Sequence, residues 1–304
     1  MNPKICVVGS LNMDLCVQTP RVPVLGETIL GGGFFTSPGG KGANQAVAAA
    51  KLGAEVTMVG RVGGDAFGAQ LTENLRLHGV ATGHIRTCAA PTGVAVILLS
   101  GHDNCIVVDP GANALLTPSD IEDAEAAIAQ SDVLLLQLEI PAQTARRAME
   151  LARGHGVKTL LNPAPASQLP PDFLALADVL TPNESECEIL TGLADERLAV
   201  KALLRLGVPR VVATLGSEGV LCSEGKAPVH KPAWPVRAAD TTAAGDSFTG
   251  ALAVSLAKGL DFDASVDFAL AAAALAVTRM GAQASLPSLE EVTEFMGSRG
   301  REIV

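Results

Sequence analysis

Short runs of apolar residues alternate with segments of helical periodicity along most of this chain. The runs lie at residues 5–8, 56–59, 133–138, 159–161, 179–180 and 211–213, and most are rich in Val, Ile or Leu. A strand that is apolar at nearly every position is buried on both faces, as in a parallel sheet covered by helices. The sequence therefore predicts an α/β fold, with a doubly wound, mainly parallel sheet flanked by helices.

Bulk composition limits the possible partners. The chain of 304 residues is 48% hydrophobic and 18% charged, which indicates a globular protein, and its net charge is -10 without a block of like charges. This balance argues against nucleic acid and anionic membrane surfaces as partners. Neither a fixed-period repeat nor a low-complexity linker divides the sequence, so we expect a single domain over residues 1–304.

Cysteine usage and the apolar stretches indicate the cellular compartment. The six cysteines form no Cys-x-x-Cys pair and have no histidine cluster beside them, which favours reduced thiols in a cytoplasmic protein. The N-terminal residues MNPKICVVGS lack the layout of a signal peptide. The longest apolar stretch, at 268–277, is too short to span a bilayer.

Two regions break the alternation of strands and helices. Residues 15–36 and 94–108 contain short alternating pieces, such as CVQT and TGVAVILLS, with no helix between them. They could form a small separate sheet that covers a site, or edge strands of the main sheet, and periodicity does not distinguish the two.

Polar residues follow several of the predicted strands. Ser10, Asn12 and Asp14 come after the first run, Glu139 after the third and Asn162 after the fourth, and further polar residues follow at 181–186 and 214–217. In open α/β sheets, ligands bind outside the carboxyl ends of the strands. The row suits a polyhydroxylated ligand, although each residue taken singly could be a turn former or a helix cap.

The glycine-rich loop SPGGKGANQA at 37–46 precedes a predicted helix beginning at Asn44. It departs from the phosphate-binding P-loop pattern, because Gly42 follows Lys41 and Phe35 occupies the position of the first glycine. Its glycines allow close backbone approach to a ligand, and Lys41 and Asn44 are side-chain donors. The alternative is a tight turn with a solvated lysine.

A second glycine-rich stretch, DTTAAGDSFTG at 240–250, enters a helix predicted at 251–258. Small residues before a helix N-terminus can form an anion hole from backbone N–H groups. Asp246 could cap the helix, or it could accept the proton of a hydroxyl that attacks a phosphorus atom held there. These residues alone leave both roles open.

Taken together, the motifs resemble the ribokinase branch of the phosphofructokinase B family of sugar kinases. The segments that carry this resemblance cover nearly the whole chain in the family's order: GSLNMD (9–14), GGKGANQA (39–46), LNPAP (161–165), TPNESE (181–186), TLGSEG (214–219), DTTAAGDSFTG (240–250) and VTRMGAQASLP (277–287). The resemblance implies a ribokinase-like α/β fold in which the insertions at 15–36 and 94–108 form a small β-sheet lid. It also implies a homodimer whose contact is that lid.

The family's site residues carry over onto matching positions. The resemblance implies that nine residues surround the sugar: Asn12, Met13, Asp14, Gly40, Lys41, Gly42, Ala43, Asn44 and Glu139. It implies that ATP lies along Asn183, Thr214, Leu215, Gly216, Ser217, Glu218, Gly219, Gly245 and Asp246. Asp246 is then also the catalytic base, the N–H groups of Ala243, Ala244 and Gly245 form the anion hole, and Glu186 assists Mg2+ indirectly.

A potassium site is implied as well. The matching positions are Asp240, Thr242, Ala276, Arg279, Gly281 and Ser285, and hard oxygen ligands suit this ion. Leu270 stands where the close family pattern has a histidine near the adenine, and Met280 replaces a lysine.

The resemblance implies ATP-dependent phosphorylation of the 5-hydroxyl of ribose. Alternatives within the same fold are a kinase for deoxyribose, fructose, a keto-deoxy sugar acid or a nucleoside. A nucleoside would need aromatic surfaces, and the chain has one tryptophan and no tyrosine. An alternative of another class is a sugar-sensing protein without catalysis, but such a protein is expected to lack the base, whereas Asp246 is present.

Overall fold

The computed structural model describes residues 2–100 and 103–300, and a large sheet forms its centre. In spatial order the strands are β13 (Val229–Lys231), β12 (Val220–Ser223), β11 (Arg210–Thr214), β10 (Val179–Leu180), β9 (Lys158–Leu161), β8 (Val133–Leu136), β1 (Lys4–Val8), β4 (Glu55–Gly63) and β5 (Ala81–Cys88). The pairs from β11 through to β5 are parallel, and only β12 is antiparallel to its neighbours. All six apolar runs are strands of this sheet, so the predicted doubly wound fold is confirmed.

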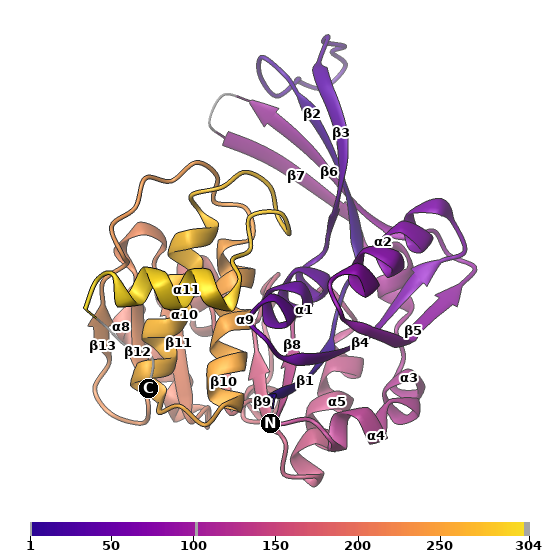
Figure 1. Ribbon diagram of the computed structural model, residues 1–304. Helices are drawn as coiled ribbons and strands as arrows, with labels where there is room; N and C mark the ends of the chain where they lie inside the picture. The colour runs from indigo at the N-terminus through magenta and orange to yellow at the C-terminus, as the bar shows by residue number, and fades with distance from the viewer. Residues whose placement is uncertain (1, 101–102, 301–304) are drawn as a thin grey trace.

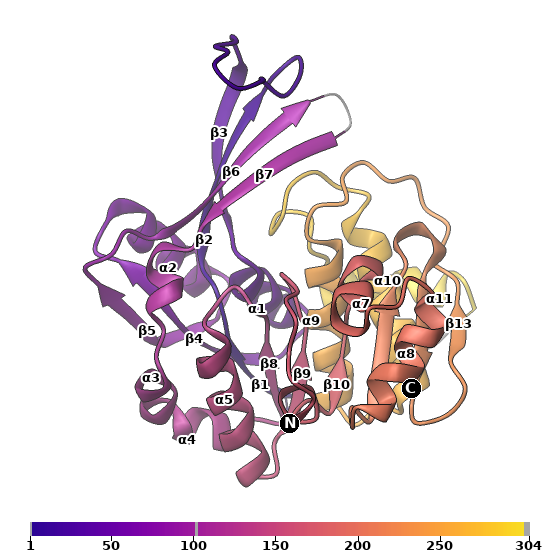
Figure 2. The same cartoon turned by 180° about the vertical axis from the view of Figure 1, so that it is seen from behind.

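Helices cover both faces of the large sheet. One face packs against α1 (Lys41–Lys51), α2 (Ala66–Leu77), α9 (Ala244–Ala257), α10 (Phe262–Ala276) and α11 (Leu289–Gly297). The other packs against α3 (Pro118–Asp123), α4 (Glu125–Ala129), α5 (Ala142–Gly154), α6 (Pro171–Leu174), α7 (Glu184–Thr191) and α8 (Glu196–Arg205). The two sets are seen from the front in Figure 1 and from behind in Figure 2.

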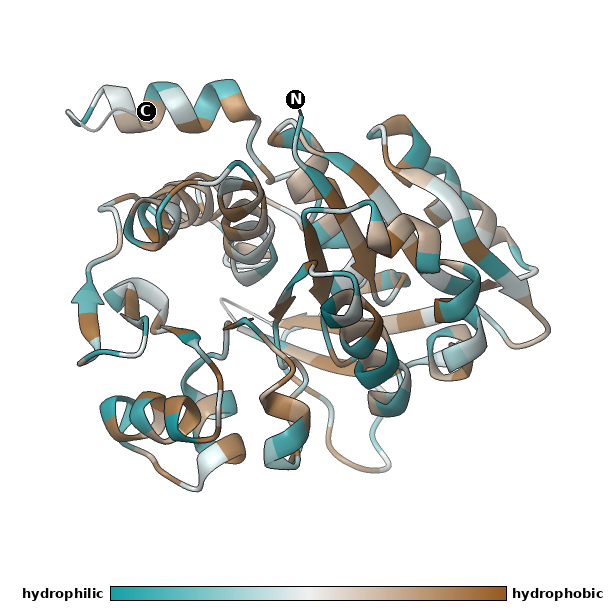
Figure 3. Cartoon of the chain, turned by 90° about the horizontal axis from the view of Figure 1, so that it is seen from below, coloured by the Kyte–Doolittle hydropathy of each residue, from teal (hydrophilic) through white to brown (hydrophobic). Residues whose placement is uncertain are grey.

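Alternate residues of one strand enter the two cores, as the strand period of two requires. Ile5 and Val7 of β1 lie in the first core, and Cys6 and Val8 lie in the second. Figure 3 shows the result, with brown strands between helices that carry teal on their outer sides. Among the described residues, no helix combines the length and the apolar character needed to span a membrane.

Local signals explain where several helices begin. Thr117 and Ser288 are N-caps with complete capping boxes at α3 and α11. Two predicted starts were wrong: α1 begins at Lys41, three residues before Asn44, and α9 begins at Ala244, well before residue 251. In both cases the later part of the glycine-rich stretch forms the first helical turn, whereas Gly39 and Gly40 and the residues 240–243 lie ahead of the helix.

A smaller, separate sheet projects from this body (Figure 1). Its spatial order is β3 (Gly32–Gly39), β2 (Asn12–Gln18), β6 (Gly93–Ser100) and β7 (Asp103–Asp109). The two regions that break the strand–helix alternation form this sheet, so the alternative of edge strands in the large sheet is wrong. The strands extend beyond the predicted limits, because Asn12 already pairs with Gly39 and Gly93.

The connecting turns are η1 (Gly111–Leu115), which follows β7, and η2 (Gly216–Glu218), which follows β11. Through η1, Asn113 joins the smaller sheet to the body. Its Nδ2 donates to the Leu11 oxygen at 3.1 Å and to Asn12 Oδ1 at 2.8 Å, and its Oδ1 accepts from Leu11 N at 2.9 Å.

Candidate active site

The polar residues predicted at the strand ends converge where the strand order reverses. From β1 the chain passes by way of the smaller sheet to β4 on one side, and β8 pairs with β1 on the other. The loops that follow β1 and β8 therefore separate at this point, which is the usual ligand position in a doubly wound sheet. A cavity of 260 Å³ opens nearby, lined by the first residue of α1, by residues that follow β9 and β10, by the last residue of β11, by α7 and by the start of α9: Lys41, Asn162, Ala164, Thr181, Asn183, Glu186, Thr214, Thr241, Ala243, Ala244, Gly245, Asp246 and Thr249.

Glu139 ties together the residues predicted to bind the sugar. Its Oε2 accepts from Ser10 Oγ at 2.5 Å, from the backbone N–H of Lys41 at 3.1 Å and from Asn12 Nδ2 at 3.4 Å. Ser10 Oγ in turn accepts from Gly42 N at 3.2 Å. Residues that follow β1 and β8 are thereby joined to β2 and α1 in one polar cluster.

Asp14 belongs to the same cluster and has an unusual pKa. A Cβ atom at Gly39 would collide with its carboxylate, so the glycine leaves room for that group. Burial, with the charges of Glu139 and Asp246, raises the Asp14 pKa to about 7. The intervening Met13 packs in the core, as does Ala43, so the side chains of these two predicted residues are not available to a ligand in the cavity.

Asp246 occupies the third position of α9 and does not cap it. The N-cap residue is Ala243, and no side chain caps this helix. The Asp246 carboxylate instead accepts one amide hydrogen bond at each oxygen, from Asn44 Nδ2 and from Gln45 Nε2, both at 2.9 Å. The capping interpretation is therefore wrong. Both donors lie on α1, so the two glycine-rich motifs meet at this carboxylate.

The backbone at the start of α9 has the features of an anion site. Ala243 has φ 59°, and it is the only non-glycine residue with positive φ in the described part of the chain. Such strain is commonly held at functional sites. Ala244 N donates to the Thr241 oxygen at 3.2 Å, while the N–H groups of Gly245 and Asp246 have no acceptor among the described residues. These are the orphan donors of a helix N-terminus.

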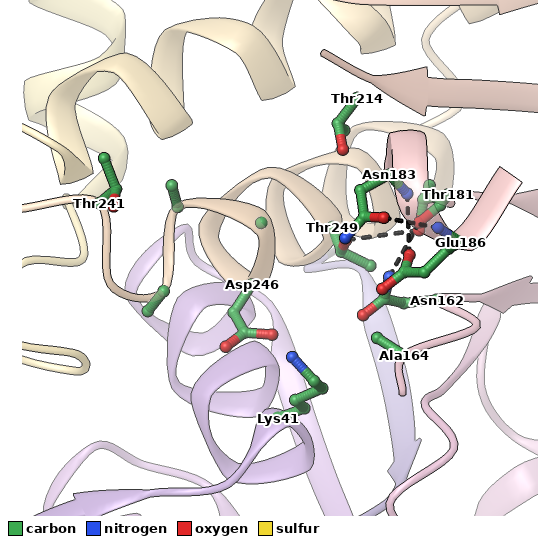
Figure 4. Close-up of a pocket in the computed structure, with 13 residues that line it drawn as sticks. Lys41, Asn162, Ala164, Thr181, Asn183, Glu186, Thr214, Thr241, Asp246 and Thr249 are labelled. Atoms are coloured by element: carbon green, nitrogen blue, oxygen red, sulfur yellow. Dashed lines mark hydrogen bonds between the residues drawn. The ribbon is translucent and has the colours of Figure 1, made fainter. Parts of the chain in front are cut away.

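Lys41 and Asp246 both line the cavity, and the Lys41 amine points toward the Asp246 carboxylate (Figure 4). Burial lowers the pKa of its ammonium group, but the carboxylates of Asp246, Glu139 and Glu186 outweigh this effect and raise the pKa above its ordinary value. Lys41 therefore stays protonated. The pKa of Asp246 is raised by burial and by Glu139, and is lowered by Lys41 and by the hydrogen bonds from Asn44 and Gln45; burial is the largest of these effects.

The opposite wall contains part of the predicted nucleotide site. Asn183 caps α7 in a capping box with Glu186, and it forms a bridge with Thr214 at the end of β11. Asn183, Glu186 and Thr214 line the cavity together with Gly245 and Asp246. The remaining predicted residues continue away from Thr214 and do not line it: Leu215, Gly216, Ser217, Glu218 and Gly219.

The segments predicted to bind potassium lie beside each other. Asp240 Oδ2 accepts from Gly281 N at 2.8 Å, and its backbone N–H donates to the Val277 oxygen at 3.2 Å. Asp240 Oδ1 accepts from both the N–H and the hydroxyl of Thr242. The Arg279 guanidinium forms an ion pair with Glu291, and Ser285 Oγ donates a hydrogen bond to the Ala282 oxygen. These two side chains are therefore occupied, and the backbone carbonyl oxygens of Arg279 and Ser285 are the atoms that would suit a cation. Among the described residues, no group of three or more His, Cys, Asp or Glu has a metal-binding arrangement.

Several residues at the site were assigned no role from the sequence; Thr241, Thr249 and Ala164 line the cavity, and Ser10, Gln45 and Gln137 hydrogen-bond around it. Ser10 and Gln45 lie inside motifs that were otherwise used, and Gln137 directly follows β8. Gln137 had a signal in the sequence, because it is a polar residue within the apolar run at 133–138. Gln45 had none beyond its place in the glycine-rich loop.

Comparisons with known proteins identify the family of this chain. Residues 2–289 match the profile described as pfkB family carbohydrate kinase, and the chain belongs to this family. It is 43% identical to a ribokinase of Haemophilus influenzae over 304 residues, which covers 97% of this chain and 99% of that protein. It is 38% identical to a deoxyribokinase of Salmonella typhi over 300 residues, which covers 96% and 98%.

Among solved structures, the Arabidopsis thaliana ribokinase complexed with ribose and ATP matches with a TM-score of 0.88. The sequence identity is 35%, and the match covers 97% of this chain and 99% of that one. The resemblance inferred from the motifs is confirmed, as is the ribokinase-like α/β fold with a separate smaller sheet.

Proposed function

We propose that this chain is an ATP-dependent ribokinase, which transfers the terminal phosphoryl group of ATP to the 5-hydroxyl of D-ribose. The observation that carries the proposal is the placement of Asp246, between the Glu139 cluster on one side and the strained N-terminus of α9 on the other. Near full-length identity of 43% to a ribokinase supports the choice of sugar.

The residues divide the chemistry as follows. Asp14, Asn12 and Glu139 hold the sugar hydroxyls, and the 5-hydroxyl lies against the Asp246 carboxylate. As the ribose oxygen forms its bond to phosphorus and the bond from phosphorus to the ADP oxygen breaks, the hydroxyl proton passes to Asp246. The N–H groups of Gly245 and of neighbouring residues, with Lys41, stabilise the charge on the transferring group. Asn183 and Thr214 contact the nucleotide, and Leu215 to Gly219 continue its site.

The donors present fit the two cations. The Glu186 carboxylate lines the cavity and could hold Mg2+ indirectly, and a magnesium ion supplies charge neutralisation to the phosphates. Asp240 and Gly281 are joined by a hydrogen bond, so Asp240 and the carbonyls of the 276–285 segment offer hard oxygen donors for potassium close to α9. Binding there would hold the 240–242 turn that leads into Ala243.

The smaller sheet acts as a lid in this proposal, and it is also the contact of a homodimer. Its exposed apolar side chains are Phe34, Phe35, Val96, Ile106, Val107 and Val108. Such a patch on a projecting sheet is typical of an interaction surface. The proposed location is the cytoplasm, where free thiols such as those of this chain persist.

A kinase for 2-deoxyribose is the second candidate, because a deoxyribokinase is 38% identical over nearly the full chain. The test measures ATP-dependent phosphorylation of ribose, 2-deoxyribose, fructose, a keto-deoxy sugar acid and a nucleoside, each with and without potassium. We expect the highest kcat/KM with ribose. Robust turnover of another sugar with none of ribose would reject the proposal, and sugar binding without any turnover would favour a sensing protein.

A further inference from the structure

Two buried glutamines form a chain of amides that ends at Asp246. Gln45 lies on α1 and Gln137 follows β8, and both side chains are fully buried. Gln45 Nε2 donates to Asp246 Oδ1 at 2.9 Å and to Asn162 Oδ1 at 3.2 Å. Gln45 Oε1 accepts from Gln137 Nε2 at 2.5 Å. Every polar group of Gln45 is therefore used, and the chain runs from Gln137 through Gln45 to the carboxylate.

The direction of this chain follows from the charge at its end. An ionised carboxylate can accept hydrogen bonds but cannot donate them, so Gln45 must present its nitrogen to Asp246. Its oxygen then points the other way and needs a donor, which is the nitrogen of Gln137. Turning either amide over would place two oxygens against each other inside the core. The orientation of both glutamines is thus tied to an ionised Asp246.

The far end of the chain shows what this arrangement costs. Gln137 Oε1 has no hydrogen-bond partner among the described residues, although it is buried. It lies against Gly9, where a Cβ atom would collide with it. An unsatisfied buried amide oxygen is unfavourable in itself. It is explained if the nitrogen of Gln137 is required at Gln45.

We propose that Gln45 and Gln137 are positioning residues, which together fix the orientation of the Asp246 carboxylate and favour its ionised form. The inference rests on the proposed function, because it assigns Asp246 as the base. Neither glutamine needs to touch the sugar or the nucleotide: Gln45 acts through Asp246, and Gln137 acts through Gln45.

Other groups near the carboxylate act on its charge as well. Asn44 Nδ2 donates to the second oxygen, and Asn44 Oδ1 accepts from Gln283 Nε2 at 3.1 Å. The charged side chains around Asp246 are Lys41 on α1, Asp14 on β2, Glu139 after β8 and Glu186 on α7. The substitutions below leave all of these groups in place.

The kinetic test compares Gln45→Met, Gln137→Met and the double variant, since methionine keeps the length and volume of glutamine without its hydrogen bonds. We expect kcat to fall about 30-fold in Gln45→Met, as for loss of one hydrogen bond to a charged group. The kcat of Gln137→Met should fall about fivefold, as for loss of a hydrogen bond between neutral groups. KM for ribose and for ATP should stay within about twofold, because the loss is confined to the transition state.

The double variant discriminates between acting in series and acting separately. If Gln137 acts only through Gln45, the double variant has the kcat of Gln45→Met. Independent effects that multiply would overturn the proposal, as would a rise in KM with unchanged kcat. Thr144→Val is the matched control: it removes the buried hydrogen bond from Thr144 Oγ1 to the Leu116 oxygen, and we expect unchanged kcat.

A second measurement does not depend on turnover. Carboxyl carbon NMR of protein labelled at aspartate, with the Asp246 signal assigned by its loss in Asp246→Asn, reports the pKa of this group. The Asp246 pKa should rise in Gln45→Met and rise by a smaller amount in Gln137→Met. If Gln45→Met does not fold, Gln137→Met alone tests the proposal. If the wild-type protein shows no kinase turnover but the Asp246 pKa changes in the variants as expected, the proposed kinase function is refuted and the positioning role is supported. Active protein in which neither substitution changes kcat or this pKa would refute the positioning role alone.

Discussion

Replacing Asp246 by asparagine should remove most turnover while leaving the fold and the sugar site intact. Asparagine has the shape of aspartate, but one of its two polar atoms is an NH2 group. That group must face either Asn44 Nδ2 or Gln45 Nε2, which are both donors, so one of the two hydrogen bonds at 2.9 Å is lost. The substitution also removes a buried charge whose pKa is raised by burial.

The loss of the base, of one hydrogen bond and of a buried charge sets the expected changes in kcat, stability and ribose affinity. Loss of a general base typically lowers the rate by 100- to 10,000-fold, so kcat should fall about 1,000-fold, or about 4 kcal/mol in activation free energy. The lost hydrogen bond costs about 1–2 kcal/mol of stability. Removing the buried charge offsets part of that cost. The free energy of unfolding should therefore change by about 1 kcal/mol or less, and the dissociation constant for ribose by a few-fold at most.

The assay combines steady-state kinetics with calorimetric ribose binding and denaturant unfolding. Asp178→Asn is the control, because the Asp178 carboxylate accepts only from Thr159 N and Thr159 Oγ1 in the described hydrogen bonds. That variant should lose stability without losing kcat. A variant Asp246→Asn with turnover near that of the wild type would refute the base assignment. Loss of ribose binding together with turnover would show a binding role instead.

Four further predictions concern the rest of the site and the lid. The kcat/KM for ribose should increase as pH rises through about 7, because the Asp14 carboxyl is protonated below this pH and accepts hydroxyl hydrogen bonds once ionised; Asp14→Asn should abolish that limb of the profile. Asn113→Leu should raise KM for ribose about tenfold with KM for ATP unchanged, since Asn113 Nδ2 fixes the amide of Asn12; equal changes for both substrates would contradict this. Removal of potassium should lower kcat, and Asp240→Ala should remove the response; equal rates in potassium-free buffer would exclude the site. If the lid forms the proposed homodimer contact, light scattering should give a dimer mass for the wild type and a monomer mass for Phe34→Glu; a monomeric wild type would refute the dimer, and a dimeric variant would refute the lid contact.

The sequence predicted the parts of the fold that are buried on both sides. The run at 133–138 is apolar except at Gln137 because β8 has helices on both faces, and a short run of this kind is typical of a strand in a parallel sheet. By contrast, β5 at Ala81–Cys88 is half exposed at the edge of the sheet, so it gives no continuous apolar signal and was not predicted. The smaller sheet was left open for a related reason. Its strands carry exposed apolar residues such as Ile106 and Val107, which periodicity cannot assign to a face.

The site could be predicted in its motifs but not in its contacts. Whether Asp246 caps a helix or acts as a base depends on Asn44, which is 202 residues away in the chain. Local sequence cannot decide such a question, because the competing partner comes from another element. Gln137 was missed for the same reason: its role depends on Gln45, which is 92 residues away.

The charges of the cavity support the proposed role of a divalent cation in the mechanism. Four carboxylates, those of Asp14, Glu139, Glu186 and Asp246, lie close enough to influence one another or Lys41, which is the only cation among these groups. ATP adds several negative charges to the same space. Lys41 and the partial charge of a helix N-terminus, about half an elementary charge, cannot balance them. The proposed magnesium ion would supply the missing positive charge, and the carboxylate of Glu186 lies in the cavity where it could help to hold such an ion.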